Sequence, residues 1–496
     1  MNMTARLSAA ALGDLPADWA RPAYDRSQPC GVVHLGTGAF HRAHQACFFD
    51  ALLAAGHDGW MIRGASLRSP TVAAQMNPQD GLFTMLVRDS GDERAQVVGS
   101  VRDVLVAPDD PAALVRALAD PAVALVTLTV TEKGYCLDPA TGALRTDDPA
   151  VAADIANIAV PQTAPGFLVA GLAARQAAGL APFTVLSCDN LPDNGQRTRA
   201  AVIALAEAVD PALAAWIAAE VAFPSSMVDR IVPATTPDDL DNFESASGWR
   251  DEALVKTEPF TQWVVEDWFS NRRPPLDEVG VQFTRDVAGW EKAKLRLLNG
   301  AHSAIAYLGG LAGYAYVHQA MAAPGFGALI EALWDEAEAT LDSVDGFDPA
   351  QYRAQLRARF ANGALMHRTH QIAMDGSQKL PQRWLQTIRA TRAAGRPVPP
   401  ALTLALAGWM RWQAGLSDSG APFVVDDPLA CETAAALAAA HGDRTAEVRG
   451  LLGIGAIFGS ELPADAAFVA ALTRAYAAIA DGSAGAAVRA FAEGRG

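Results

Sequence analysis

The 496-residue chain is poor in cysteine, short of cationic residues and without a long apolar run. Its five cysteines are widely spaced and form no Cys-x-x-Cys pair, which is typical of reduced thiols in a cytoplasmic protein and not of a disulfide framework. Lysine and arginine number 39 against 55 aspartates and glutamates. The resulting net charge of −16 argues against nucleic acid and anionic membrane surfaces as partners. No stretch reaches the roughly 18 apolar residues of a transmembrane helix, so we expect no membrane span.

The composition is that of a globular protein, with 51% hydrophobic and 19% charged residues, and the length favours two large domains. In the first half, short apolar runs alternate with helical stretches, which predicts an α/β fold with a Rossmann-type, doubly wound parallel sheet. The expected buried strands are residues 32–35, 60–65, 124–130 and 183–187. The expected helices between them include 45–55, 111–119 and 198–209. We place a dinucleotide-binding domain with extensions at 1–285.

From about residue 286 onward, strand-like runs nearly vanish and helical periodicity dominates. We therefore expect a mostly α-helical domain at 286–496 that binds substrate and carries catalysis. Its predicted helices are 292–308, 326–341, 351–360, 384–394, 402–413 and 466–479. The meeting of two such domains is a natural place for a reaction that must exclude water.

A Gly-x-Gly turn follows the first predicted strand, at Gly36 and Gly38. Glycines there let the backbone approach a pyrophosphate at the start of the next helix, as in dinucleotide-binding folds. The usual third glycine is missing, so an ordinary tight turn is the alternative interpretation. The candidate cofactor-binding residues around this turn are Gly36, Gly38, Ala39, Phe40 and Arg42.

The strongest candidate for catalysis is the stretch from Lys294 to His302. In a regular helix, Asn299 lies about 140° and His302 about 80° around the axis from Lys294, so the three share one broad face. A lysine among leucines is expected to have a lowered pKa and to accept a proton from an alcohol, while an amide steadies the developing alkoxide. The alternative is a surface lysine followed by a histidine satisfied within the core.

Two polar loops follow predicted strands and supply further candidates. Asn190 comes after the strand at 183–187, at the sheet edge where open α/β folds bind ligands, and offers a second amide donor. Glu132 follows the strand ending at Val130 and is suited to relaying protons to water. The alternatives are a capping-rich turn for Asn190 and a solvated carboxylate for Glu132.

Other charged residues have both a functional and a structural interpretation. Asp229 and Arg230 form either a structural ion pair or, for Asp229, a group that orients the catalytic lysine. Arg368 and Lys379 together are suited to holding a carboxylate, although they are equally typical of helix-end charges. Two His-x-x-His pairs, beginning at His41 and His367, lack the further ligands of a zinc site, and we expect no metal.

Several blocks together resemble one family, that of mannitol dehydrogenase and fructuronate reductase (D-mannonate oxidoreductase), the polyol-specific long-chain dehydrogenases. The blocks are HLGTGAFHRAHQ at 34–45, LTVTEKGYC at 128–136, SCDNLP at 187–192, MVDRIVP at 227–233 and LLNGAHS at 297–303. The resemblance implies a Rossmann-type domain, a helical C-terminal domain, no metal and NAD-dependent oxidation of a secondary alcohol.

By matching position, the resemblance also implies residue roles. Lys294 would be the general acid/base, Asn190 and Asn299 would stabilise the oxyanion, His302 would bind substrate, and Glu132 would gate the proton path. These roles agree with those inferred from the residue chemistry.

Two departures from the best-known mannitol enzymes bear on specificity. Gln371 stands where those enzymes have an arginine eight residues before the lysine matching Lys379. The block around it, 367–383, looks more like the mannonate/fructuronate branch, whose hexonate carries a carboxylate. Second, Pro70 and Thr71 replace an acidic pair suited to the ribose of NAD, while Arg68 and Ser69 leave NADP open as an alternative.

We therefore expect a cytoplasmic, metal-independent, NAD-dependent dehydrogenase of a sugar acid or polyol, with D-mannonate/D-fructuronate favoured. The alternatives are a D-mannitol 2-dehydrogenase or a related polyol dehydrogenase and, from another class, a catalytically silent NAD-binding sensor. The candidate substrate-binding residues are Asp229, Arg368, Gln371 and Lys379. The sequence leaves the oligomeric state and the physiological direction open.

Overall fold

The computed structural model describes residues 5–138 and 141–494. The chain forms two compact units, which divide between Ala288 and Gly289. None of the described helices combines the length and the hydrophobicity that crossing a bilayer requires.

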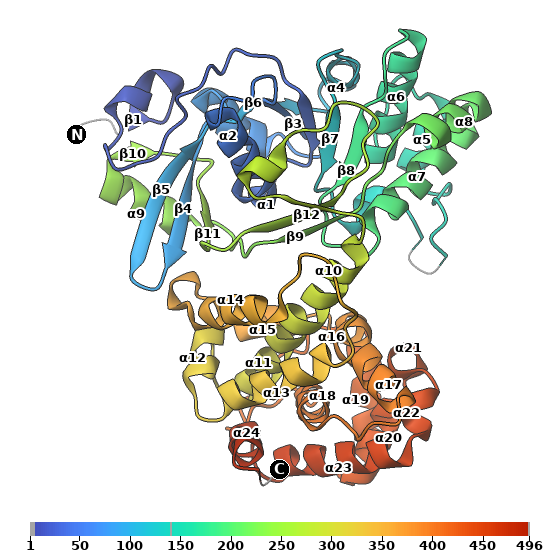
Figure 1. The fold of residues 1–496 in the computed structure, drawn as a ribbon. Helices are drawn as coiled ribbons and strands as arrows, with labels where there is room; N and C mark the ends of the chain where they lie inside the picture. The colour runs from blue at the N-terminus through green and yellow to red at the C-terminus, as the bar shows by residue number, and fades with distance from the viewer. Residues whose placement is uncertain (1–4, 139–140, 495–496) are drawn as a thin grey trace. The chain divides into compact units, whose positions relative to one another are not determined.

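The centre of the first unit is a five-stranded parallel sheet (Figure 1). Its strand order is β6-β3-β2-β7-β8, so the chain starts in the middle, winds to one edge and then crosses to the other. Ligands bind at such a reversal, beyond the carboxyl ends of the central strands. The strands are β2 (Val32–Leu35), β3 (Ile62–Ser66), β6 (Val101–Val106), β7 (Leu125–Leu128) and β8 (Thr184–Ser187).

Helices cover the two faces of this sheet, as the doubly wound fold predicts. Alternate residues of β2 enter different cores: Val32 packs in a cluster with Phe49 and Leu52 of α2, and Val33 packs in a second cluster with Phe167 of α6. The principal helices are α1 (Ala39–Ala43), α2 (Gln45–Ala54), α4 (Pro111–Leu118), α6 (Ala164–Ala177) and α7 (Asn194–Val209).

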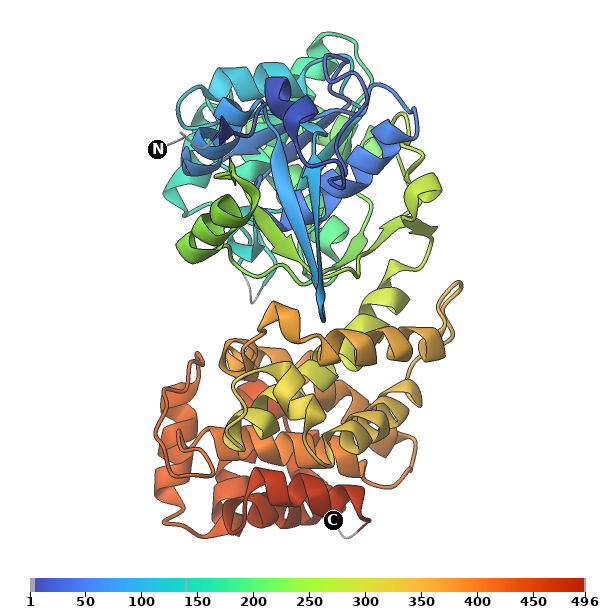
Figure 2. The ribbon, with the colours of Figure 1, turned by 90° about the vertical axis from the view of Figure 1, so that its left-hand side faces the viewer.

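Several strands were not predicted from the sequence. Between β3 and β6 lies an antiparallel hairpin of β4 (Phe83–Asp89) and β5 (Asp92–Val98), seen in light blue in Figure 2. A small separate sheet contains β9 (Ser226–Asp229), β12 (Gln262–Glu266) and β13 (Gln282–Thr284). The hairpin carries exposed charged residues and β13 has no buried residue, so neither shows the continuous apolar run by which the central strands were recognised.

The second unit is built from helices, and every named strand of the described residues lies in the first unit. α18 (Pro400–Trp412) packs against both α11 (Gly300–Leu311) and α23 (Ala466–Ala480). The other long helices are α13 (Phe326–Glu338), α14 (Pro349–Ala361) and α17 (Gln386–Ala393).

One predicted helix is wrong in a way that affects the site. Residues 292–308 are not one regular α-helix: α10 (Val287–Lys294) passes into a π-helix, Leu295–Asn299, before α11 begins. The Gly300 N–H donates to the carbonyl of Leu295, five residues earlier. A π turn takes more residues per turn than an α-helix, so the angles expected for a regular helix do not describe this stretch. A second π-helix, Pro381–Leu385, precedes α17.

Candidate active site

The first unit holds a pocket of about 480 Å³ at the carboxyl ends of β2, β3 and β7. The segments that follow these three strands form its wall, which is where a parallel sheet of this order binds a ligand. Four of the expected cofactor residues line it, namely Gly36, Gly38, Arg68 and Ser69. Lining residues that the sequence analysis did not single out include Thr37, Thr129, Val130, Thr131, Lys133, Gln162 and Thr163.

Gly36 is required by the geometry of the turn. Its φ of +96° disfavours any residue with a Cβ, and a Cβ built there would lie 2.2 Å from the Thr129 carbonyl oxygen. The backbone is held on both sides, because the Gly36 N–H donates to Ala65 and the Thr129 hydroxyl donates to the Gly36 carbonyl at 2.7 Å. The backbone of the turn is therefore fixed where a pyrophosphate is expected.

The remaining expected cofactor residues, Ala39, Phe40 and Arg42, lie outside the described lining of this pocket. Ala39 and Phe40 pack against the core beside α2. The Arg42 side chain is buried, and desolvation lowers its pKa to about 10. Its Nε and Nη1 atoms have no hydrogen-bond partner among the described residues.

Two buried histidines, His34 and His41, lie next to the glycine turn, and their contact was not predicted from the sequence. The rings of His34 and His41 stack with centroids 3.4 Å apart, and both residues are fully buried. Desolvation lowers the pKa of His34 to about 3 and that of His41 well below its usual value, so both are neutral near pH 7. His34 hydrogen-bonds Thr127 and Thr129, which joins β2 to β7.

The His-x-x-His pairs do not act as pairs in the structure. His41 stacks on His34, whereas His44 hydrogen-bonds the Gln262 carbonyl at 2.9 Å. His367 contacts His302, whereas His370 lies against Trp412. Among the described residues, no three His, Cys, Asp or Glu side chains form a group suited to a metal ion.

The loops after β7 and β8 place the two polar candidates of the first unit at its surface. Glu132 is exposed and begins a short 3-10 helix, Glu132–Tyr135, while Asn190 is exposed beyond β8. The loops are linked by Asp189, which is buried and accepts hydrogen bonds from the backbone N–H groups of Val130 and Thr131. Asp189 was not predicted as a site residue from the sequence, although it stands directly beside Asn190.

Asp229 and Arg230 take separate positions after β9. Asp229 is buried at the end of that strand, opposite Gln262 of β12. The Arg230 guanidinium donates to the carbonyl oxygens of Ala43 and Glu258, so it serves to hold backbone segments together.

In the second unit, the three candidates of the 294–302 stretch lie on either side of the π turn or within it. Lys294 ends α10 and is only 6% exposed, Asn299 ends the π-helix, and His302 lies in the first turn of α11. Burial of an amine penalises its charged form, which is the condition for a lysine to act as a base near neutral pH. Single-turn π segments inside α-helices occur frequently at functional sites.

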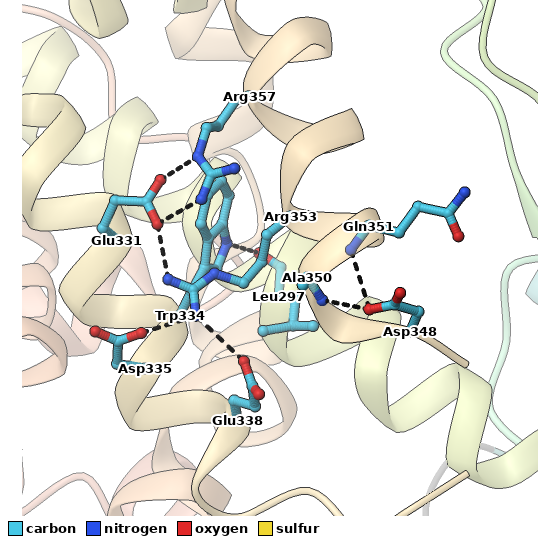
Figure 3. Close-up of polar contacts among 10 residues, drawn as sticks. All are labelled: Leu297, Glu331, Trp334, Asp335, Glu338, Asp348, Ala350, Gln351, Arg353 and Arg357. Carbon is cyan, nitrogen blue, oxygen red and sulfur yellow. Dashed lines mark hydrogen bonds and ion pairs between the residues drawn. The ribbon is translucent and has the colours of Figure 1, made fainter. Parts of the chain in front are cut away.

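Side chains from elsewhere in the second unit bind the carbonyls of this stretch. The Trp334 indole N–H donates to Leu297 at 2.9 Å, and the Trp384 indole N–H donates to Gly300 at 3.0 Å. Figure 3 shows the first of these contacts, with Arg353 beside Trp334 and ion-paired to carboxylates of α13.

Arg383, from the second π-helix, reaches the same stretch. Its Nη1 donates to the Ser303 hydroxyl at 2.7 Å and to the Asn299 carbonyl at 3.4 Å. Desolvation lowers its pKa to about 10, which leaves it charged at neutral pH. The two π-helices therefore support each other, and the backbone around Asn299 is fixed by donors outside its own helix.

The buried His302 forms an imidazole pair with His367, which is partly buried. The ring centroids are 4.7 Å apart in an edge-on arrangement, and Phe360 packs on His302. Burial lowers the pKa of both rings, that of His367 to about 4. Nε2 of His302 and Nδ1 of His367 are buried atoms with no hydrogen-bond partner among the described residues.

The expected carboxylate-binding residues are less organised. Arg368 and Gln371 are exposed, and the Arg368 guanidinium lies 5.9 Å from the centroid of the Tyr316 ring. Lys379 is held by the Met374 carbonyl at 2.5 Å, with Asp375 at 3.8 Å. Desolvation, followed by the Arg383 charge, lowers the pKa of Lys379.

A parallel sheet with the order found here, a glycine turn after its central strand and a pocket beyond the strand ends together define a Rossmann-type dinucleotide-binding protein. The helical second unit, with its buried lysine and neutral imidazoles, adds the groups of acid–base chemistry.

Comparison with known proteins identifies the family. The Mannitol dehydrogenase Rossmann domain matches residues 30–278, and the Mannitol dehydrogenase C-terminal domain matches residues 286–480. The chain belongs to the mannitol dehydrogenase family and is an oxidoreductase acting on CH–OH groups.

Relatives similar to this chain include an uncharacterized oxidoreductase, a D-mannonate oxidoreductase and a mannitol 2-dehydrogenase. It is 44% identical over 466 residues to the uncharacterized oxidoreductase YeiQ of Escherichia coli K12, covering 93% of this chain and 95% of the relative. It is 42% identical over 464 residues to the D-mannonate oxidoreductase of the same organism, covering 92% and 95%. The structure of Pseudomonas fluorescens mannitol 2-dehydrogenase with NAD and D-mannitol is 37% identical, with a TM-score of 0.83 and coverage of 98% and 99%.

Proposed function

We propose that this protein is an NAD-dependent dehydrogenase that interconverts a secondary alcohol and a ketone on a six-carbon sugar acid, with D-mannonate and D-fructuronate as the preferred pair. The observation that carries the chemistry is the burial of Lys294 in a stretch whose backbone is fixed by Trp334, Trp384 and Arg383. A buried lysine is suited to taking a proton from a hydroxyl group, and the fixed backbone limits the positions that its side chain can take.

The pocket at the sheet edge fits NAD. Gly36 and Gly38 both line it, and the rest of the described lining includes polar groups after three strands. Gly36 and Gly38 would hold the pyrophosphate, with Arg68 and Ser69 at the ribose. The nicotinamide, when bound, supplies hydride transfer.

In the proposed reaction, Lys294 removes the hydroxyl proton as the alcohol is oxidised and returns it in the reverse direction. Asn190 and Asn299 donate hydrogen bonds to the oxygen as it gains negative charge, which lowers the barrier. The neutral His302 imidazole positions a neighbouring hydroxyl group, and Glu132 passes protons between Lys294 and water. Asp229 helps to orient Lys294.

The preference for a hexonate is supported by the region around Gln371. Arg368 and Lys379 supply positive charge for a carboxylate that a polyol lacks. D-mannitol 2-dehydrogenase is the second candidate, supported by the similarity to the Pseudomonas fluorescens enzyme. A catalytically silent NAD-binding sensor is disfavoured by the buried lysine and its fixed surroundings.

A parallel assay tests the proposal. Purified protein is given NADH with D-fructuronate or D-fructose, and NAD with D-mannonate or D-mannitol. We expect the kcat/KM for D-fructuronate to exceed that for D-fructose by at least about tenfold. A tenfold preference for fructose would reassign the substrate to the polyol branch, and absence of turnover with all four substrates would reject both substrate pairs.

A further inference from the structure

The loop after β7 contains a strained residue. Thr131 has φ of +65° and ψ of 166°, a backbone region that is essentially confined to glycine. A β-branched side chain makes this conformation still less favourable. Such a conformation persists only where its surroundings impose it, so something must hold Thr131 in place.

The holding group is the carboxylate of Asp189. One of its oxygens accepts the Thr131 N–H at 2.9 Å, and the other accepts the Val130 N–H at 3.0 Å and the Tyr135 hydroxyl at 2.6 Å. Asp189 is 8% exposed, and burial raises its pKa and that of Tyr135. Buried hydrogen bonds to a carboxylate are among the stronger ones in proteins.

Asp189 is itself firmly anchored. The Asn194 side-chain amide, at the start of α7, donates to the Asp189 carbonyl at 3.0 Å and to the Ser226 carbonyl of β9 at 2.7 Å. The Tyr135 hydroxyl also hydrogen-bonds the Ser187 hydroxyl of β8 at 2.5 Å. We call the Asp189 carboxylate with its three hydrogen bonds the clamp. It is tied to two strands and one helix, so we expect the exposed loop at Thr131 to adapt its conformation to Asp189.

The two residues that this clamp grips belong to the dinucleotide pocket, because Val130 and Thr131 both line it. The next residue along each loop is a proposed catalytic group: Glu132 follows Thr131, and Asn190 follows Asp189. We propose that Asp189 is a positioning residue, which holds Thr131 in its strained conformation and thereby keeps the pocket wall, Glu132 and Asn190 in their working positions. The roles of Glu132 and Asn190 rest on the proposed function, whereas the effect on the dinucleotide pocket does not.

A double-mutant cycle with Thr131→Gly tests this coupling. In Asp189→Asn, one oxygen becomes an NH2 group, which cannot accept a backbone N–H. Either Val130 or Thr131 then loses its acceptor, which weakens the hold on the Thr131 conformation. We expect the Kd for NADH, measured by fluorescence titration, to rise at least about tenfold. Glycine adopts the strained conformation without the clamp, so in the Thr131→Gly background the same substitution should raise the Kd less than about threefold.

A matched control separates positioning from general stability. Asp251 is another buried carboxylate that accepts backbone N–H groups, from Thr84 and Ala253, and it lies outside the described pocket lining. Asp251→Asn should lower the melting temperature and leave the NADH Kd within about twofold of wild type. Equal losses of NADH affinity in both Thr131 backgrounds, or none in Asp189→Asn, would overturn the proposal.

Should Asp189→Asn fail to fold, Tyr135→Phe provides the same test in a milder form. It removes one of the three hydrogen bonds to the Asp189 carboxylate and should weaken NADH binding about threefold, and Thr131→Gly should again suppress this effect. An unchanged NADH affinity in Tyr135→Phe would then reject the clamp. Because NADH binding needs no substrate, a failed substrate assay would reject only the proposed function.

Discussion

The indole N–H of Trp384 donates to the carbonyl oxygen of Gly300 at 3.0 Å, and so links the second π-helix to the residue that follows the first. The two π-helices also pack on each other directly. The backbone between Lys294 and His302 is therefore set by groups about 80 residues further along the chain.

Trp384→Phe should reduce both stability and turnover. The change keeps most of the ring volume and leaves the buried Gly300 carbonyl without its indole donor, which should cost about 1–3 kcal/mol of unfolding free energy. The control is Trp409→Phe, because the buried Trp409 indole N–H has no partner among the described residues. Chemical denaturation and kcat measurements should show larger losses of stability and turnover in Trp384→Phe than in Trp409→Phe. Equal losses would argue against a specific role of the Trp384–Gly300 hydrogen bond.

Lys294→Ala should lower kcat by about 10³-fold and leave the NADH Kd within about threefold, because it removes the base and not the dinucleotide pocket. Lys292→Ala is the matched control on the same helix, since Lys292 is partly exposed and ion-paired to Asp342 at 2.7 Å. Retention of turnover in Lys294→Ala would refute the assigned role.

Gly36→Ala should abolish NADH binding and destabilise the first unit by about 3 kcal/mol. The alanine would have to adopt a positive φ, and its Cβ would also clash with the Thr129 carbonyl. Gly56→Ala separates the two effects. Gly56 has a similar φ of +92°, but nothing lies within 4 Å of its Cβ position, so only about 1 kcal/mol should be lost. Similar thermal shifts in the two variants would contradict the close approach at Gly36.

The cofactor preference should depend on Arg68. If its guanidinium provides tolerance for a 2′-phosphate, Arg68→Ala should lower kcat/KM with NADP at least about tenfold and leave that with NAD within about twofold. Ser69→Asp should act in the same direction by repelling the phosphate. Parallel assays with the two cofactors check this, and equal losses with both would assign Arg68 a general role in binding.

The partly buried His367 should make stability depend on pH. Its pKa is about 4 in the folded protein and close to 6.5 in the unfolded chain, so between these values only the unfolded chain is protonated. Stability from this residue is full above pH 6.5 and falls by about 1.4 kcal/mol per pH unit as the pH drops toward 4. In urea denaturation series between pH 4.5 and 6.5, His367→Gln should reduce the slope of the free energy of unfolding against pH by that amount. An equal slope in the variant and the wild type would disprove the role of His367.

The positions of four of the five central strands, β2, β3, β7 and β8, follow closely from local sequence, whereas β6 was not predicted. The runs around Val33 and Val126 are mainly apolar, with His34 and Thr127 as their buried polar members, because both faces of a parallel sheet are buried. Gly36 marks the turn that follows the first run. These signals lie within a few residues of each other, so the strand, the turn and the helix after them were recognisable. The hairpin β4–β5 was missed because its exposed charged residues break the apolar pattern.

The candidate site likewise has features that follow from local sequence and features that depend on tertiary packing. The chain alone placed Lys294, Asn299 and His302 in one short helical stretch, since their spacing is local. It did not indicate the π-helix between them, the His302–His367 pair or the clamp from Asp189 to Thr131, because each depends on partners that are brought together only by tertiary packing. Spacing and hydrophobic pattern thus determined which chemical groups are present and on which elements, whereas folding decided their burial, their charge and the backbone conformation in which they are held.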